Sequence, residues 1–373
     1  MKQLAEVSER ASNRRSFLKN SMVAGAVATV GAGILGNGLP AFAAETGSSK
    51  LNKGDIAILR FLAAAELIEA DLWTQYSELG GLTPGQLPVE TAPFKPMNTF
   101  QAALMKLDSD GPQYITSNTN DEQSHADFLN AYLISMGAEP VDFDAFRTLP
   151  SSQAAGADQI GRLTNLMNLK VDTSWYTRYR STKNPDLGAT FPQAIDLVNV
   201  TGIPRTDADF EPKNHVQAIA NTAAFHFGTI EQGGSTLYAA MAQKASNVQV
   251  LQIAVSIGGD EVAHFLEWVD FAGNGVQPPL APFTDPVTGL TFPNFDVTFN
   301  PAIQTNLIFP VPCEFISASL PRCAVIRPTN PKGIAATVVT FLTEMGLFIG
   351  QSPTFLKQLA TLASQADAAE RTL

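Results

Sequence analysis

Apolar residues recur at helical spacing over four long stretches of the chain, with polar residues between them. In the first stretch, Leu59, Leu62 and Trp73 fall on one stripe, as in an amphipathic helix. Asp55 is a suitable cap before this stripe, and Gly80-Gly81 is typical of a helix end. The pattern predicts helices over residues 55–79, 112–136, 213–245 and 247–273. Because almost nothing separates the last two, we expect them to pack as an antiparallel hairpin.

The remainder of the chain is less regular. Residues 100–107 predict a short helix, whereas 139–212 are irregular, with 166–171 and 175–179 as either short strands or extended segments. So long an insertion usually covers a site or forms a subunit contact, and a homo-oligomer is therefore one of the expectations. Residues 274–332 are rich in proline and alternate apolar with polar positions, which indicates β-like or extended structure. Two more helices are predicted, over 334–349 and from about 353 to 369.

The N-terminal segment resembles a twin-arginine export signal. Arg14-Arg15 precede Phe-Leu-Lys, a short apolar run rich in Gly and Ala, and Ala41-Phe42-Ala43, a small-x-small cleavage site. A membrane-anchor helix is the alternative, but the apolar run is short, rich in Gly and followed by the cleavage site. We therefore expect residues 1–43 to be a signal peptide and 44–54 a linker, and the mature chain to be periplasmic or extracellular.

Charge and composition narrow the function classes. Of the 373 residues, 45% are apolar, which is enough for a large core, and the formal net charge is −11. Loss of residues 1–43 removes five basic and two acidic residues from the totals of 24 and 35, so the mature chain carries −14. So acidic a protein is not expected to bind nucleic acid or an anionic membrane. The two cysteines, Cys313 and Cys323, predict one disulfide in an oxidising compartment.

Two four-residue words repeat the same chemistry. Glu122-Gln-Ser-His125 and Glu261-Val-Ala-His264 each place a carboxylate and an imidazole three positions apart in a predicted helix. Residues at this spacing lie on one helix face. One such word is usually solvated surface. Two of them, with a Glu on each of two further helices, are the ligand set of a four-helix bundle that binds two metal ions.

The other two carboxylates are expected on the first and third long helices. Glu231 lies in an apolar helix, where an unpaired carboxylate is costly. Gly233-Gly234 follow it at a cost of roughly 2 kcal/mol in helix propensity, which a close helix approach or room for a small ligand would explain. On the first helix either Glu66 or Glu69 qualifies, and the apolar stripe favours Glu66. The predicted metal ligands are Glu66, Glu122, His125, Glu231, Glu261 and His264, holding two ions of iron or manganese.

The other two histidines are weaker candidates. His215 stands near a predicted helix start, where we expect it to be exposed. His226 is five residues before Glu231, off its direct face, and is interpreted as a surface residue or a neighbour of the ligands.

With these residues in place, the chain resembles the ferritin-like superfamily, and more narrowly the secreted ferritin-like proteins related to plant desiccation-related proteins. The resemblance spans residues 55–273, with an insertion at 139–212, and leaves 274–373 outside it. It implies a mainly α fold, namely a four-helix bundle with long irregular insertions and a C-terminal helical extension packed on it. The stretches that carry it are Ala65–Trp73, Glu122–Leu129, Glu231–Tyr238 and Glu261–His264.

The resemblance leaves a class of reactions open, because ferritins, manganese catalases and diiron oxygenases share this ligand pattern. One expectation is an oxidoreductase that uses oxygen or peroxide as its small-molecule partner in stress protection. The alternative is a non-enzymatic desiccation- or stress-associated binding protein with a structural or vestigial metal pair. A storage cage is disfavoured, because long insertions would hinder closure of a shell.

Overall fold

The computed structural model describes residues 50–83, 95–178, 192–298, 310–312, 316–324 and 331–372. The predicted signal peptide, and Cys313 of the predicted disulfide, lie outside these ranges. From Leu51 onward the described chain forms one compact unit, and its fold is mainly α, as predicted. None of the described helices is both long enough and apolar enough to cross a membrane.

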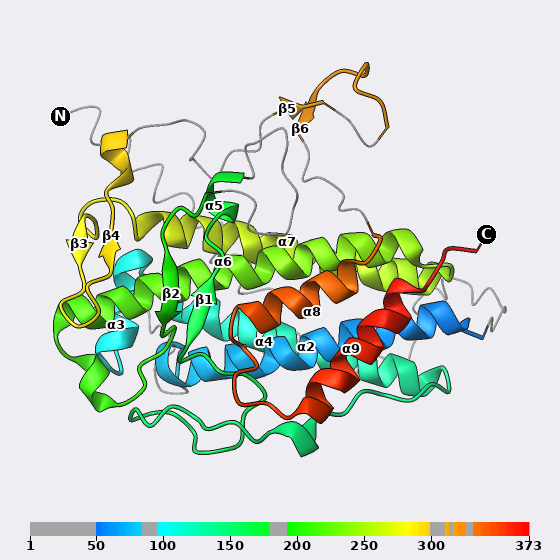
Figure 1. Ribbon diagram of the computed structural model, residues 1–373, viewed down its shortest axis with the longest axis horizontal. Helices are drawn as coiled ribbons and strands as arrows, with labels where there is room; N and C mark the ends of the chain where they lie inside the picture. The colour runs from blue at the N-terminus through cyan, green and yellow to red at the C-terminus, as the bar shows by residue number, and fades with distance from the viewer. Residues whose placement is uncertain are drawn as a thin grey trace, which may run out of the picture. The chain divides into compact units, whose positions relative to one another are not determined.

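Four long helices form the bundle (Figure 1). Helices α6 and α7 pack along their length as the predicted hairpin, since only Ala245–Asn247 separate them. Helices α2 and α4 form the second pair, and they run antiparallel: Leu82, just beyond α2, bonds to Thr116, while Glu66 lies beside His125. The four helices are α2 (Lys53–Gly80), α4 (Gly111–Ser135), α6 (Lys213–Lys244) and α7 (Val248–Asn274).

Helix α2 begins earlier than predicted, and Asp55 is not its N-cap. Its N-cap is Asn52, whose side chain accepts a hydrogen bond from the Asp55 backbone amide at 2.8 Å. The buried Asp55 carboxylate instead accepts hydrogen bonds from the backbone amides of Ser246 and Asn247. Asp55 therefore fastens α2 to the tight α6–α7 connection. At its other end α2 stops at Gly80, as predicted.

Helix α4 is polar for a bundle helix because its buried face carries functional groups. Asn118, Thr119, Glu122 and His125 are all buried on it. Phe128, three residues after His125, is 51% exposed and does not belong to this buried face. A short helix, α3 (Thr99–Leu107), packs against α6, α4 and α2.

The insertion between α4 and α6 lies on the bundle, and its described residues form no long helix. The stretch left open as strand or extended contains β1 (Leu169–Val171), which pairs antiparallel with β2 (Leu197–Val200). The second open stretch is instead a single helical turn, α5 (Trp175–Arg178). Buried Asp71 of α2 anchors the insertion by accepting hydrogen bonds from the Leu163 and Thr164 amides. Two short 3-10 helices, at Asp144–Phe146 and Asp207–Phe210, complete this region.

The described part of the C-terminal region adds two helices and two small two-stranded sheets. Helix α9 (Pro353–Asp367) packs on α2 and on α8 (Ile334–Glu344). Lys244 of α6 donates hydrogen bonds to three backbone carbonyls at the C-terminal end of α9. The helix predicted over 334–349 corresponds to α8 and is shorter than expected. It ends at Glu344, because Gly346 takes a positive φ of 95°. The two sheets pair β3 (Phe283–Thr284) with β4 (Thr291–Phe292) and β5 (Pro310–Val311) with β6 (Cys323–Ala324), and a 3-10 helix (Phe295–Thr298) follows β4.

Candidate metal centre

All six predicted ligands point into the middle of the bundle. Each of the four helices carries at least one of them, and none of the six residues is more than 9% exposed. Such burial is expensive for charged groups unless cations or hydrogen bonds compensate it. The residues come from α2 (Glu66), α4 (Glu122 and His125), α6 (Glu231) and α7 (Glu261 and His264).

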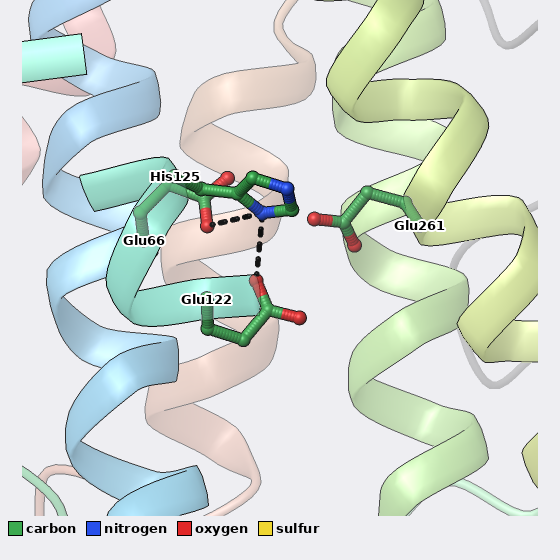
Figure 2. A group of neighbouring side chains, drawn as sticks. All are labelled: Glu66, Glu122, His125 and Glu261. Carbon is green, nitrogen blue, oxygen red and sulfur yellow. Dashed lines mark hydrogen bonds and ion pairs between the residues drawn. The ribbon is translucent and has the colours of Figure 1, made fainter. Parts of the chain in front are cut away.

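One group of four donors surrounds His125 (Figure 2). Its Nδ1 lies 3.2 Å from Glu122 Oε2 and 3.4 Å from Glu66 Oε2. Glu261 reaches toward the same point from α7, on the opposite side of the bundle. One donor atom from each residue lies within 4.8 Å of all the others, which is a spacing that a single metal ion can span.

A second group of donors adjoins the first through a shared residue. His264 Nδ1 lies 3.2 Å from Glu122 Oε1 and 3.2 Å from Glu231 Oε2. Glu122 therefore offers one oxygen to each histidine group, as a carboxylate that bridges two ions must do. Glu69, Glu231 and Glu261 form a third group within the same 4.8 Å limit. Glu66 and Glu69 therefore both lie among the candidate donors, Glu66 in the first group and Glu69 in the third.

Two aspartates that are not among the predicted residues contact the Nε2 atoms of the two histidines. His125 Nε2 lies 3.3 Å from Asp260 of α7, and His264 Nε2 lies 3.4 Å from Asp121 of α4. The contacts are crossed, since each aspartate precedes the Glu of one word and holds the histidine of the other. With Nε2 held in this way, Nδ1 of each ring is directed at the carboxylates. The signal was present in the sequence, because both words read Asp-Glu-x-x-His.

Polar neighbours donate hydrogen bonds to three of the carboxylates. Asn118 Nδ2 donates to Glu122 Oε1 at 2.7 Å and to Glu231 Oε1 at 3.3 Å. The orientation of this amide is set in turn by Trp268, whose indole N–H donates to Asn118 Oδ1 at 2.7 Å. On the other side, the Tyr238 hydroxyl donates to Glu66 Oε1.

The two adjacent glycines of α6 have different surroundings. A Cβ added at Gly234 would lie 1.9 Å from Glu261 Oε2, so the missing side chain makes room for that carboxylate. A Cβ added at Gly233 would meet no atom of the described residues within 4 Å. Of the two explanations that the sequence suggested, the close approach therefore applies at Gly234.

The electrostatics describe a cluster that lacks cations. Burial and the neighbouring Glu231 raise the pKa of Glu122 to about 8. Burial and the surrounding carboxylates raise the pKa of Glu261 and Glu69 well above the ordinary 4.5. Although burial lowers it, hydrogen bonds to Asp260, Glu122 and Glu66 raise the pKa of His125 to about 12. Without metal, protons and imidazolium groups must supply the positive charge that these carboxylates require.

The donor set fits two metal ions. Both Glu261 oxygens and Glu69 Oε2 are buried without a hydrogen-bond partner among the described residues. A buried carboxylate oxygen left unbonded is costly, and a metal ion would occupy it. Five carboxylates and two imidazoles form the clusters, which is the oxygen and nitrogen donor chemistry that iron and manganese accept.

Comparison with known protein families agrees with this geometry. Residues 54–268 match the ferritin-like domain, which is more than half of the chain. The chain belongs to the ferritin-like family. Comparison with curated proteins and with solved structures gave no match. The matched range of this ferritin-like domain contains all six predicted ligands, Glu69 and both aspartates, whereas α8 and α9 follow it.

The other two histidines of the ferritin-like chain lie away from the carboxylate clusters. The prediction that His215 is exposed is wrong: it is 2% exposed, between Asp285 and Asp209. The surface interpretation of His226 is also wrong, because its ring is fully buried and bonded to the Tyr76 hydroxyl. Neither histidine belongs to a group of donors that could hold an ion among the described residues.

Proposed function

We propose that this ferritin-like protein holds two iron or manganese ions in the bundle and uses them in redox chemistry with peroxide or dioxygen. The observation that carries the proposal is the position of Glu122, which offers one oxygen to each of two histidine-centred groups. Unbonded buried oxygens of Glu261 and Glu69 support it. The proposed ligands are Glu66, Glu122, His125, Glu231, Glu261 and His264, with Glu69 as a further carboxylate.

The chain's own residues would position the ions and exclude water from the centre. When bound, two such ions supply reversible electron transfer to a small oxidant. Asp260 and Asp121 keep both histidines facing the carboxylates, so the ligand geometry is fixed before any ion enters.

Export and stress protection complete the proposal. Residues 1–43 carry the twin-arginine pattern, and that route is used by proteins that fold before export, often with their cofactor already bound. Removal of peroxide outside the cytoplasm would suit a protein related to desiccation-related proteins. We infer a periplasmic or extracellular location from the signal alone.

The test is turnover of the metal-loaded, exported protein. The iron and manganese forms are each given peroxide, and oxygen release and peroxide loss are followed; reduced protein is given dioxygen in parallel. We expect turnover with one of the metals and at least about a 100-fold loss in Glu122→Gln, because a neutral amide cannot bridge two cations. Asp127→Asn is the matched control, since Asp127 is exposed on the same helix. Absence of turnover with both metals and both oxidants would overturn the redox proposal.

A structural metal pair is the second candidate. Five carboxylates and two imidazoles can fill most coordination positions of two ions and leave few for a substrate. Azide added to the iron form separates the two candidates. A new ligand-to-metal absorption band supports an open reactive centre. An unchanged spectrum, together with a higher melting temperature on metal binding, favours the structural role.

A further inference from the structure

A tyrosine and a histidine meet in the core, about two helical turns along α2 from Glu69. The Tyr76 hydroxyl of α2 and Nδ1 of His226 on α6 lie 2.7 Å apart, and both side chains are fully buried. The backbone closes over the contact, because a Cβ added at Gly202 would lie 2.4 Å from the hydroxyl oxygen. Water therefore does not compete for this hydrogen bond.

The second contact of His226 determines which atom carries the proton. Its Nε2 lies 3.1 Å from the thioether sulfur of Met345, which can only accept a hydrogen bond. Nε2 therefore carries the ring hydrogen, and the lone pair of Nδ1 accepts the phenolic hydrogen of Tyr76. Burial lowers the pKa of His226 to about 3, so the ring is neutral at physiological pH and has a free site for that proton.

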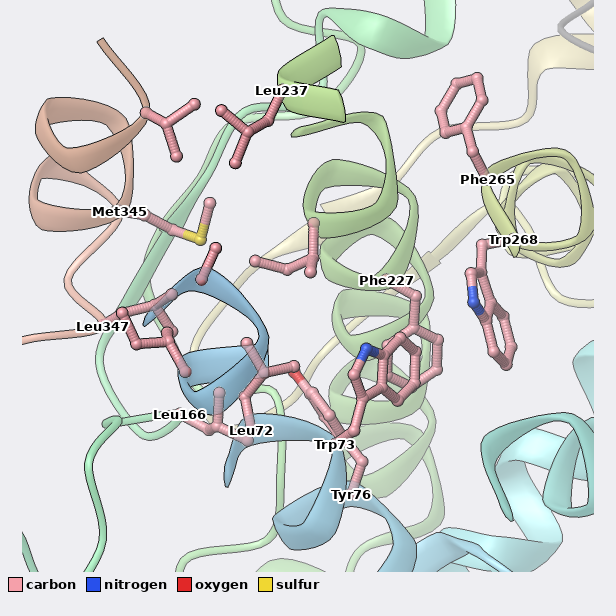
Figure 3. Close-up of a cluster of buried hydrophobic side chains, with 14 of the residues drawn as sticks. Leu72, Trp73, Tyr76, Leu166, Phe227, Leu237, Phe265, Trp268, Met345 and Leu347 are labelled. Carbon is pink, nitrogen blue, oxygen red and sulfur yellow. The ribbon is translucent and has the colours of Figure 1, made fainter. Parts of the chain in front are cut away.

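Aromatic rings connect this pair to the proposed metal centre (Figure 3). Asn118 is hydrogen-bonded both to Glu122 and to the indole N–H of Trp268. Trp268 stacks on Trp73 with ring centroids 5.3 Å apart, and Trp73 lies 5.9 Å from Tyr76. Phe227 contacts all three rings, at centroid distances of 4.6–4.8 Å. The series contains three oxidisable side chains in van der Waals succession.

Only the last member of the series faces a base. Trp73 Nε1 is buried without a hydrogen-bond partner among the described residues, and Trp268 Nε1 faces an amide oxygen. An oxidised indole at either position keeps its proton, remains a cation and readily takes an electron from a neighbour. Tyr76 can instead release its proton to His226 as it loses an electron, because an oxidised phenol is a far stronger acid than a phenol. An oxidising equivalent in the series therefore comes to rest at Tyr76.

We propose that Tyr76 and His226 form a proton-coupled redox pair that takes up oxidising equivalents from the metal centre through Trp268 and Trp73. In this step Tyr76 loses one electron, its O–H bond breaks, and an N–H bond forms at His226 Nδ1. The electron passes to an ion of the centre in a higher oxidation state, for which peroxide or dioxygen is the terminal oxidant. The source of oxidising equivalents rests on the proposed function, whereas the pair itself is present without metal.

The test of the pair uses the metal-free full chain. A ruthenium photosensitiser with an irreversible electron acceptor oxidises the protein under a light pulse, and electron paramagnetic resonance detects the radicals. With ring-deuterated tyrosine and ¹⁵N-histidine, we expect a neutral tyrosyl spectrum whose width depends on the deuterium. We also expect a ¹⁵N coupling from the protonated His226. Slower formation in D₂O reports the coupled proton transfer.

Variants assign the radical. Tyr76→Phe should lower the tyrosyl yield at least tenfold, and His226→Gln should do the same because an amide is not a base, with an indole radical remaining in both. Tyr132→Phe is the control, since Tyr132 lies near the surface and bonds to Gln249. An unchanged yield in Tyr76→Phe, or a Tyr76 radical with no ¹⁵N coupling and no isotope effect, would overturn the proposal. If either variant misfolds, the labelled wild-type spectrum still decides.

A second arm tests the connection to the centre. The metal-loaded chain is mixed with peroxide and frozen, and we expect the same tyrosyl spectrum, reduced at least tenfold in Trp73→Phe. A light-induced Tyr76 radical that peroxide never produces in a metal-loaded chain overturns the connection. A chain that binds no metal but gives the light-induced signal contradicts the proposed function and leaves the redox pair supported.

Discussion

The protein buries histidine among carboxylates in two places, and the two places differ in how the carboxylates are partnered. His215 Nδ1 lies 3.0 Å from Asp285 and its Nε2 lies 3.2 Å from Asp209. Asp285 also accepts from Val287 and Thr288, and Asp209 accepts from Arg205. Each carboxylate has donors enough, and the pKa of both is lowered despite burial. This His215 cluster is a complete structural unit.

The bundle centre uses the same residue types with a different balance. Five carboxylates share two histidines, the amide of Asn118 and the hydroxyl of Tyr238, and no described lysine or arginine pairs with them. Four of their oxygens have no hydrogen-bond partner among the described residues, and the pKa of Glu122 rises to about 8. The comparison teaches that the supply of donors, rather than the presence of histidine and carboxylate, separates a structural cluster from a candidate metal site.

The largest expected effect comes from removing one charge at each cluster. Glu122→Gln should abolish binding of at least one ion, because the shared ligand is lost, while leaving the His215 cluster intact. Asp285→Asn should leave the metal content unchanged and lower the free energy of unfolding by about 3 kcal/mol, since it breaks a buried pair. Elemental analysis and urea titration of both variants measure this. Equal metal loss in the two variants would break the comparison.

Substitution of the adjacent glycines is the second prediction. In Gly234→Ala the new Cβ would displace the Glu261 carboxylate, so we expect at least about a tenfold loss of metal affinity. Gly233→Ala meets no atom of the described residues within 4 Å and should gain about 1 kcal/mol of helix stability without loss of metal. Metal titration and thermal melts distinguish the two, and a loss of affinity in Gly233→Ala alone would reverse the assignment.

The aspartates behind the histidines give the third prediction. Asp260→Asn should weaken metal binding about 10–100-fold, because the amide no longer fixes the His125 ring as a carboxylate does. Asp121→Asn should have a similar effect through His264. Exposed Asp127→Asn on α4 is the control, and it should bind metal as the wild type does. If Asp260→Asn binds metal with unchanged affinity, the crossed contacts do not orient the ligands.

The pH dependence of stability should be opposite at the two clusters. The pKa of Glu122 is raised from 4.5 to about 8, so its contribution to metal-free stability is complete below pH 4.5 and is lost as the pH rises to 8. The lowered pKa of Asp209 and Asp285 gives stability above pH 3.8 that is lost in acid. Urea titrations of metal-free Glu122→Gln and Asp285→Asn across this range separate the effects. A slope between pH 5 and 8 that is the same in wild type and Glu122→Gln would contradict the account.

The sequence was sufficient to predict the four long helices and to find the two Glu-x-x-His segments, because both depend on local spacing along the chain. It could not separate Glu66 from Glu69, since residues three apart on α2 both face the bundle axis. The burial of His215 was missed because its partner Asp285 is 70 residues away. Asp121 and Asp260 were within reach of sequence reasoning, but their crossed contacts depend on how α4 packs against α7.

The central claim is that the bundle binds two ions through a shared Glu122. Its most direct test is anaerobic titration of the metal-free protein with Fe²⁺ and with Mn²⁺, followed by calorimetry and by elemental analysis after desalting. The account predicts saturation at about two ions per chain, with release of protons as Glu122 and Glu261 give theirs up. It also predicts at most one ion in Glu122→Gln. Saturation at none with either metal, or two ions bound by Glu122→Gln at wild-type affinity, would contradict it.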